Sequence, residues 1–252
     1  MKNSRIILIR RKHVAALLLT LAVAAIFYLV SRPGLTAEAR AIPIYSVQRE
    51  DRAVSLTFNV EITDDDHTKQ VMQTLNAYGV RATFFVTGQW VRQNEDLARR
   101  LIQSGHELQN LSNSHGQIRA LPLEELKENL SACSDSIEAV SGHRPAVFRA
   151  PYGAYDDRVI RAAEAMGMRT VQWSVDSGDW RIGEAEAIIR GVLGRAYPGA
   201  IILLHTGREQ TTRALPDILE GLLREEYLPI PVSELMLEPA YTITLTGRQI
   251  PA

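Results

Sequence analysis

Val54-Ser-Leu-Thr-Phe58 has the length and composition of a buried strand, and Asn59 follows it directly. Residues 68–78 come next and carry apolar side chains at helical spacing, with Gly79 placed to end the helix. Ala82-Thr-Phe-Phe-Val86 then repeats the strand pattern. This succession predicts a strand–helix–strand unit with parallel strands, because the helix returns the chain to the starting edge of the sheet.

The same alternation continues along the chain. Further strands are predicted over residues 146–148, 169–175 and 200–204, and further helices over 95–104, 123–140, 156–166, 185–196 and 211–226. This many units favours an α/β fold whose parallel sheet closes, or nearly closes, into a barrel. Residues 241–251 alternate apolar and polar side chains, and we expect an added strand there.

Polar side chains follow four of the predicted strands. They are Asn59, Arg149, Asp176 and His205. In a barrel of parallel strands the carboxyl ends of the strands share one rim, and active sites gather there. Any one of these residues could equally be an ordinary polar loop residue. Four of them at one rim predict a shared pocket.

The formal net charge of −1 combines two oppositely charged regions. Residues 1–40 contain seven basic residues and one acidic residue, so residues 41–252 carry 21 basic and 28 acidic residues. A net charge of −7 on the folded part argues against a nucleic-acid partner, which requires a basic face. The sequence also lacks a glycine-rich nucleotide-binding loop and a Gly-x-Ser-x-Gly nucleophile motif.

The N-terminal region resembles a membrane anchor. Five basic residues lie within residues 1–13, and residues 14–30 are apolar except for Thr20. This predicts a cytoplasmic segment (1–13), a transmembrane helix (14–30) and a linker (31–50), with the rest of the chain outside the cell membrane. A signal peptide cleaved near Ala37-Glu-Ala39, giving a secreted protein, is the alternative. The main domain is expected over residues 51–238 and a C-terminal tail over 239–252.

Five segments, in order, resemble the motifs of the polysaccharide deacetylases of the nodulation-factor type, carbohydrate esterase family four. They are Leu56-Thr-Phe-Asn59-Val60, residues 106–115, Phe148-Arg-Ala-Pro-Tyr152-Gly153, residues 173–180 and Leu203-Leu-His205. Each motif is short, but their joint order and spacing make the resemblance specific. The resemblance implies a distorted (β/α)7 barrel.

The resemblance also implies an activity: hydrolysis of the carbon–nitrogen bond of N-acetyl groups, or of O-acetyl esters, on glycans such as peptidoglycan or chitin oligomers. Family members hold a divalent, zinc-type metal with one Asp and two His. A second Asp acts as base on the metal-bound water, and a late His acts as acid. The metal lowers the pKa of the bound water and polarises the acetyl carbonyl.

The sequence departs from this pattern at the metal site. Asn59 and Val60 stand at the two Asp positions, and Leu111 stands at the first His position, while His115 is retained. An amide cannot accept a proton as a base, and a catalytic zinc normally has three protein ligands. The resemblance retains Arg149, Asp176 and His205 as candidate catalytic residues and Tyr152, Trp180 and Asn59 as candidate substrate-binding residues.

Glu61 and Asp64 are the nearest replacements for the missing metal ligands. A simpler interpretation is that Asp64 to Asp66 cap the helix that begins near Thr68. Three hypotheses remain open: an active deacetylase with an altered ligand set, a pseudoenzyme that binds envelope glycan, and an assembly protein of the envelope, for example in sporulation.

Overall fold

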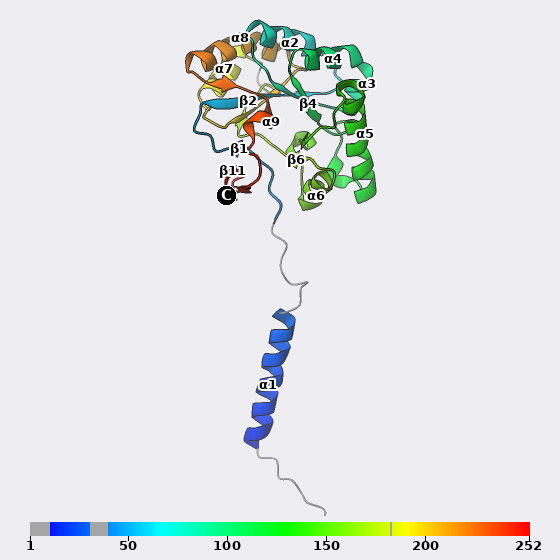
Figure 1. The fold of residues 1–252 in the computed structure, drawn as a ribbon, viewed down its shortest axis with the longest axis vertical. Coiled ribbons are helices and arrows are strands. Elements are labelled where there is room, and N and C mark those ends of the chain that lie inside the picture. The colour runs from blue at the N-terminus through cyan, green and yellow to red at the C-terminus, as the bar shows by residue number, and fades with distance from the viewer. Residues whose placement is uncertain (1–10, 31–39, 182) are drawn as a thin grey trace, which may run out of the picture. The chain divides into compact units, whose positions relative to one another are not determined.

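The computed structural model describes residues 11–30, 40–181 and 183–252, and the chain divides into two compact units, Met1–Arg40 and Ala41–Ala252 (Figure 1). The first unit contains helix α1 (Arg11–Val30). Among the described residues, no helix combines the length and the apolar character needed to cross a membrane. The anchor predicted over residues 14–30 is therefore not supported, and parts of the predicted segments 1–13 and 31–50 lie outside the described residues.

The second unit is built on a curled parallel sheet. Its strands are β2 (Ala53–Val60), β3 (Thr83–Val86), β4 (Glu107–Asn110), β5 (Val147–Phe148), β6 (Arg169–Thr170), β7 (Val175–Asp176), β8 (Ile201–His205) and β9 (Leu228–Pro229). They lie in the order β6-β5-β4-β3-β2-β8-β7, and β9 pairs with the beginning of β2. All of these pairs are parallel, as the alternation of strands and helices predicts.

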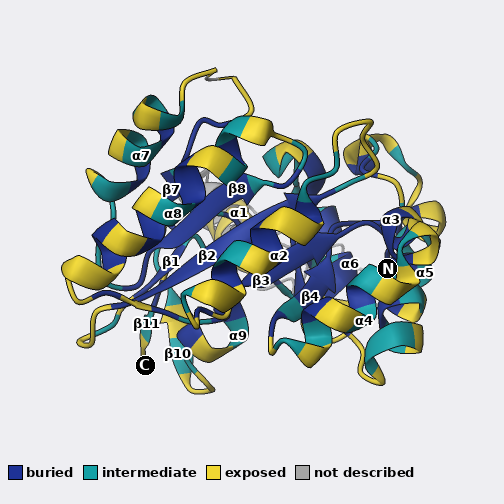
Figure 2. Ribbon diagram, turned by 90° about the horizontal axis from the view of Figure 1, so that it is seen from above, coloured by how far each residue is buried: buried dark blue, intermediate teal, exposed yellow. Residues whose placement is uncertain are grey.

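Helices connect the strands and cover the sheet. They are α2 (Thr68–Ala77), α3 (Gly88–Gln93), α4 (Glu95–Gln103), α5 (Leu123–Ser141), α6 (Asp157–Ala165), α7 (Ala185–Leu193), α8 (Glu209–Arg224) and α9 (Val232–Leu235), with 3₁₀ turns η1 (Ile118–Ala120) and η2 (Pro151–Gly153). Figure 2 shows buried strands beside helices whose outer faces are exposed. The helices are therefore amphipathic, and each buries one stripe against the sheet or a neighbouring helix.

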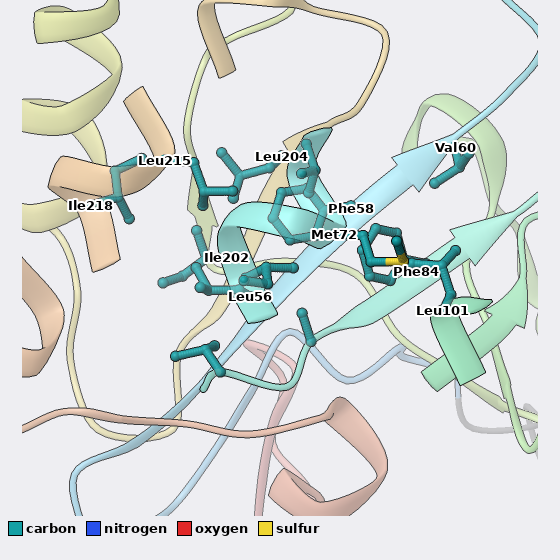
Figure 3. Packing of buried hydrophobic residues seen from close by; sticks show 14 of the residues in the cluster. Leu56, Phe58, Val60, Met72, Phe84, Leu101, Ile202, Leu204, Leu215 and Ile218 are labelled. Carbon is teal, nitrogen blue, oxygen red and sulfur yellow. The ribbon is translucent and has the colours of Figure 1, made fainter. Parts of the chain in front are cut away.

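Strand β2 is buried along its whole length and separates two regions of the interior. Leu56, Phe58 and Val60 pack into the larger hydrophobic cluster with residues of α2 and α8, where Figure 3 shows Val60 among the labelled side chains. Successive side chains of a strand point to opposite faces, so Thr57 and Asn59 face the other side. This alternation directs Asn59, but not Val60, toward the interior of the curled sheet.

The strand predicted over residues 169–175 is in fact two strands, so this prediction was wrong. The first two residues pair with β5, whereas Val175 and Asp176 pair with β8 at the other end of the sheet. Residues 171–174 connect the two ends directly, and Ile44 bridges to Val171 there. The curl thus brings the ends of the sheet together through a short connection, which is consistent with the expected distorted (β/α)7 barrel.

The C-terminal tail contributes a second, three-stranded sheet. Strand β1 (Ser46–Val47) pairs in parallel with β11 (Arg248–Pro251), which pairs antiparallel with β10 (Tyr241–Ile243). The added strand expected in the tail is confirmed, and the tail belongs to the same compact unit as the barrel.

Gly199 precedes β8 where it meets β1, and it requires glycine for two reasons. Its φ is +85°, and an added Cβ would clash with the Val47 carbonyl oxygen. Gly142 (φ +76°), in contrast, has nothing within 4 Å of its Cβ position.

We expect Gly142→Ala to lower the free energy of unfolding by only about 1–2 kcal/mol, the cost of a left-handed backbone with a side chain. Gly199→Ala should cost clearly more in urea denaturation, because the backbone must also move. Equal losses for the two variants would contradict this packing.

Candidate functional site

A cavity of about 350 Å³ opens at the carboxyl ends of the strands. Its lining residues are Asn59, Glu61, His115, Tyr152, Trp173, Asp176, Trp180, Leu203, His205 and Arg208. A second cavity, of about 210 Å³, shares Asn59, Glu61, His205 and Arg208 with the first and adds Thr63, Asp64, Asp65 and Gly207. The predicted convergence of strand-end residues on one pocket is therefore confirmed for Asn59, Asp176 and His205.

Arg149 lies behind the cavity wall rather than in it. The side chain is completely buried; Nη1 donates to Asn59 Oδ1 (3.1 Å), and Nη2 donates to Thr57 Oγ1 (2.9 Å) and to the Gln172 carbonyl (3.1 Å). Its guanidinium carbon lies 4.0 Å from the centre of the Phe85 ring. Burial lowers the pKa of Arg149 to about 9, so the group keeps its charge at neutral pH.

The contact with Arg149 fixes the orientation of the Asn59 amide. Because Oδ1 accepts the hydrogen bond from the guanidinium, Nδ2 is the amide atom left to face the cavity. A carboxylate here would neutralise Arg149 and could act as a base. With Asn59 in place, the described residues around the guanidinium offer it only neutral oxygen acceptors.

His205 is held by Asp179, a residue that the sequence analysis did not single out. Asp179 Oδ1 lies 2.8 Å from His205 Nδ1, and Oδ2 accepts from the His205 backbone N–H and from Thr211 Oγ1 (2.7 Å each). Burial would raise the pKa of Asp179, but these bonds hold it below its ordinary value. Asp179 lies directly before Trp180 in the fourth motif, and that position is the sequence signal that could have identified it.

Asp176, the residue predicted for this motif, has a different position. It lines the cavity, and its Oδ1 accepts from the Gly178 backbone N–H at 2.8 Å. The contact to the imidazole is therefore made by Asp179, and the predicted catalytic role of Asp176 stays a prediction.

Glu61 and His115 lie together on another wall of the cavity. His115 Nδ1 is 2.5 Å from Glu61 Oε2, but the two groups are not aligned as a hydrogen bond. Burial alone would raise the pKa of Glu61, but the neighbouring His115, His205 and Arg208 lower it. The Tyr152 ring lies over His115 with 4.5 Å between ring centres. Glu61 thus stays ionised next to the one histidine retained from the metal motif.

The two apolar substitutions in the metal motifs are packed into hydrophobic clusters. Val60 is fully buried in the cluster around β2, α2 and α8, and Leu111 is fully buried in a second cluster with Phe85 and Ile201. Of the expected ligand set only His115 remains, and its Nδ1 faces Glu61. Among the described residues, no group of three His, Cys, Asp or Glu side chains is arranged to hold a metal ion. The side chains present therefore do not fit the family's metal.

The acidic segment after β2 has two roles. Asp66 Oδ1 accepts from the Thr68 backbone N–H at 2.9 Å, and its Oδ2 accepts from Trp90 Nε1 at 2.7 Å. The N-cap of α2 is His67, which makes no side-chain capping bond, so of the predicted capping only the bond that Asp66 accepts from the first N–H of the helix is present. Asp64 and Asp65 are exposed and line the smaller cavity, so Asp64 lies near the site without contacting His115.

Two aromatic side chains of the larger cavity are open to solvent. Tyr152 is 69% exposed and Trp180 is 51% exposed, and both were predicted to bind substrate. Exposed rings that line a cavity together with polar side chains can stack on the apolar faces of sugar rings. Their position is compatible with that predicted role.

The buried Asp179 predicts how stability depends on pH. Its pKa is lower in the folded protein than in the unfolded chain, so its stabilising effect is complete above the ordinary Asp pKa of about 3.9 and is lost as pH falls below it. Asp179→Asn should lower the free energy of unfolding by about 3 kcal/mol at pH 7, and this loss should shrink as the pH falls below about 3.9. The exposed Asp135→Asn, which removes an ion pair with Arg144, should cost under about 1 kcal/mol. A difference between wild type and Asp179→Asn that stays constant with pH would contradict this assignment.

The polysaccharide deacetylase family model matches residues 46–171. A chitooligosaccharide deacetylase from Bradyrhizobium is 34% identical over 214 residues, which are 77% of this chain and 98% of that protein. A peptidoglycan-N-acetylglucosamine deacetylase from Listeria monocytogenes is 31% identical over 194 residues, but these are only 41% of its length.

Among solved structures, the chain is similar to a pseudoenzyme of carbohydrate esterase family 4 from Bacillus anthracis, with 30% identity and a TM-score of 0.72 over 77% of this chain and 68% of that chain. A mutant of that pseudoenzyme with restored enzymatic activity is equally similar. The matched family model, the similar relatives and the curled parallel sheet agree. The chain belongs to the polysaccharide deacetylase family.

Proposed function

We propose that this family member binds glycan of the cell envelope in the larger cavity and has lost metal-dependent deacetylation. The observation that carries the proposal is the packing of Val60 and Leu111. Both stand at metal-ligand positions of the family, and both are fully buried in hydrophobic clusters. The base position holds Asn59, whose oxygen already accepts from Arg149.

The remaining groups do not replace what is missing. A positioned acid such as His205, held by Asp179, typically contributes about 10²–10⁴-fold to a rate. Acetamide hydrolysis also needs an activated water and stabilisation of the negative charge that develops on the carbonyl oxygen, and the metal supplies both in the family. An acid alone protonates a leaving group only after water has attacked. The retained histidine is therefore insufficient for ordinary turnover.

Several features support glycan binding. The exposed rings of Tyr152 and Trp180 lie beside the polar side chains of the cavity. The matched relatives act on chitooligosaccharide and peptidoglycan, and a similar solved structure is a pseudoenzyme. A second candidate, an active deacetylase with a different ligand set, is favoured by the intact Asp179–His205 pair.

We further propose that the domain acts outside the cytoplasm, attached to the membrane or secreted. The basic residues before the apolar run at 14–30 support this location, and relatives that act on peptidoglycan are consistent with it. Protease added to intact spheroplasts should digest the domain, whereas protection until lysis would contradict the proposal. A role in envelope assembly or sporulation rests on the family resemblance alone.

The loss of turnover predicts a defined restoration. With zinc present, the full-length protein should release no acetate above background from N-acetylglucosamine oligomers or from peptidoglycan. The triple variant Asn59→Asp, Val60→Asp, Leu111→His puts the family's base and two ligand residues back at their positions in the sequence, and we expect it to release acetate.

The matched control for this restoration is Asn59→Asp with Val60→Asp. It leaves Leu111 in place, so it has one ligand fewer than the triple variant and should stay inactive. Acetate release by the wild-type protein at the rate of the triple variant would contradict the proposal and favour the second candidate.

A further inference from the structure

The two histidines of the larger cavity present the same kind of atom to it. His205 Nδ1 lies 2.8 Å from Asp179 Oδ1, so the proton of the neutral ring is on Nδ1 and the lone pair is on Nε2. His115 Nδ1 likewise faces the Glu61 carboxylate at 2.5 Å. In the neutral imidazoles, both Nε2 atoms are therefore hydrogen-bond acceptors.

The acceptor on His115 lacks a partner. The side chain is 7% exposed and lines the cavity, and both ring nitrogens are buried with no hydrogen-bond partner among the described residues; Nδ1 lies close to Glu61, whereas Nε2 has no such neighbour. A buried polar atom without a partner is costly, and it is normally satisfied by a ligand or water when one is bound. His115 Nε2 therefore points to a ligand that donates a hydrogen bond.

The charges around the two cavities favour a cationic donor. Glu61 is half-buried and lines both cavities. The guanidinium of Arg208 lines both cavities. Three further carboxylates each line one of the two cavities. These carboxylates are Asp64, Asp65 and Asp176. Four carboxylates beside one guanidinium give this part of the surface a negative local charge, which attracts cations.

We propose that the cavity recognises the protonated amine of an amino sugar, that is, a glycan from which the N-acetyl group has already been removed. The ammonium group donates to Glu61, to His115 Nε2 and to His205 Nε2. This inference rests on the proposed glycan binding and specifies the chemical state of the glycan.

The chemistry of the alternatives favours the amine. A primary ammonium group carries three N–H donors and a positive charge, which match two imidazole acceptors and one carboxylate. An N-acetyl group has only one N–H donor. Its carbonyl oxygen is itself an acceptor, so it would be repelled by the lone pairs of the imidazole nitrogens and the carboxylate. A metal ion needs several ligands at fixed short distances, and the described residues contain no such group.

The test compares two oligomers of equal length. The full-length protein is titrated by calorimetry near neutral pH with glucosamine tetramer and with N-acetylglucosamine tetramer. We expect the glucosamine tetramer to bind at least tenfold more tightly. Glu61→Gln should reduce that preference at least fivefold, mainly by weakening the binding of the glucosamine tetramer.

The control variant is Glu95→Gln. Glu95 is an exposed residue of α4 that pairs with Arg99, so this variant removes the same formal charge outside the cavities. It should leave both affinities unchanged, whereas a loss equal to that of Glu61→Gln would overturn the inference by showing an effect of net charge. Equal or tighter binding of the acetylated tetramer would overturn the inference but leave glycan binding intact. Absence of binding by both tetramers would overturn the inference and the proposed function together.

Discussion

The buried guanidinium of Arg149 holds together the part of the sheet on which the site is built. It extends from the end of β5, donates to Thr57 and Asn59 of β2 and to the carbonyl of Gln172, and lies over the Phe85 ring of β3. Gln172 belongs to the connection between the two ends of the curled sheet. One side chain therefore cross-links three strands and the closing connection just beneath the cavity.

This cross-link explains why an amide at the family's base position is compatible with the fold. Removing one partner of a buried ion pair usually costs several kcal/mol, because the remaining charge is left uncompensated. Here an amide replaces the carboxylate, so the guanidinium keeps a hydrogen bond to Asn59, and neutral oxygens and an aromatic ring complete its surroundings. The substitutions at Val60 and Leu111 go further, since each adds an apolar side chain to a hydrophobic cluster. The two positions at which the family has metal ligands are thus part of the core in this chain.

Most of the fold, and the location of the site, could be predicted from the sequence, because periodicity and strand ends are local signals. The strand expected over residues 54–58 is β2, which is one residue longer at its beginning and two residues longer at its end. Asn59 and His205 line one cavity, as expected. The break between β6 and β7 could not be predicted, because an apolar run does not show which neighbouring strand it pairs with. The contact of Asp179 with His205 depends on the loop after β7, and the approach of Glu61 to His115 depends on how the chain leaves β2. Neither contact has a spacing rule.

The central claim is that apolar packing has replaced the metal site while the cavity lined by hydrogen-bond acceptors remains. The amount of zinc bound per chain tests this claim most directly. The wild-type protein is incubated with excess zinc, desalted, and analysed for zinc per chain by elemental mass spectrometry. With His115 as the one family ligand left, we expect less than about 0.1 zinc per chain, because a stable catalytic site normally needs three protein ligands. A value close to one zinc per chain, lost on substitution of His115, would contradict the account.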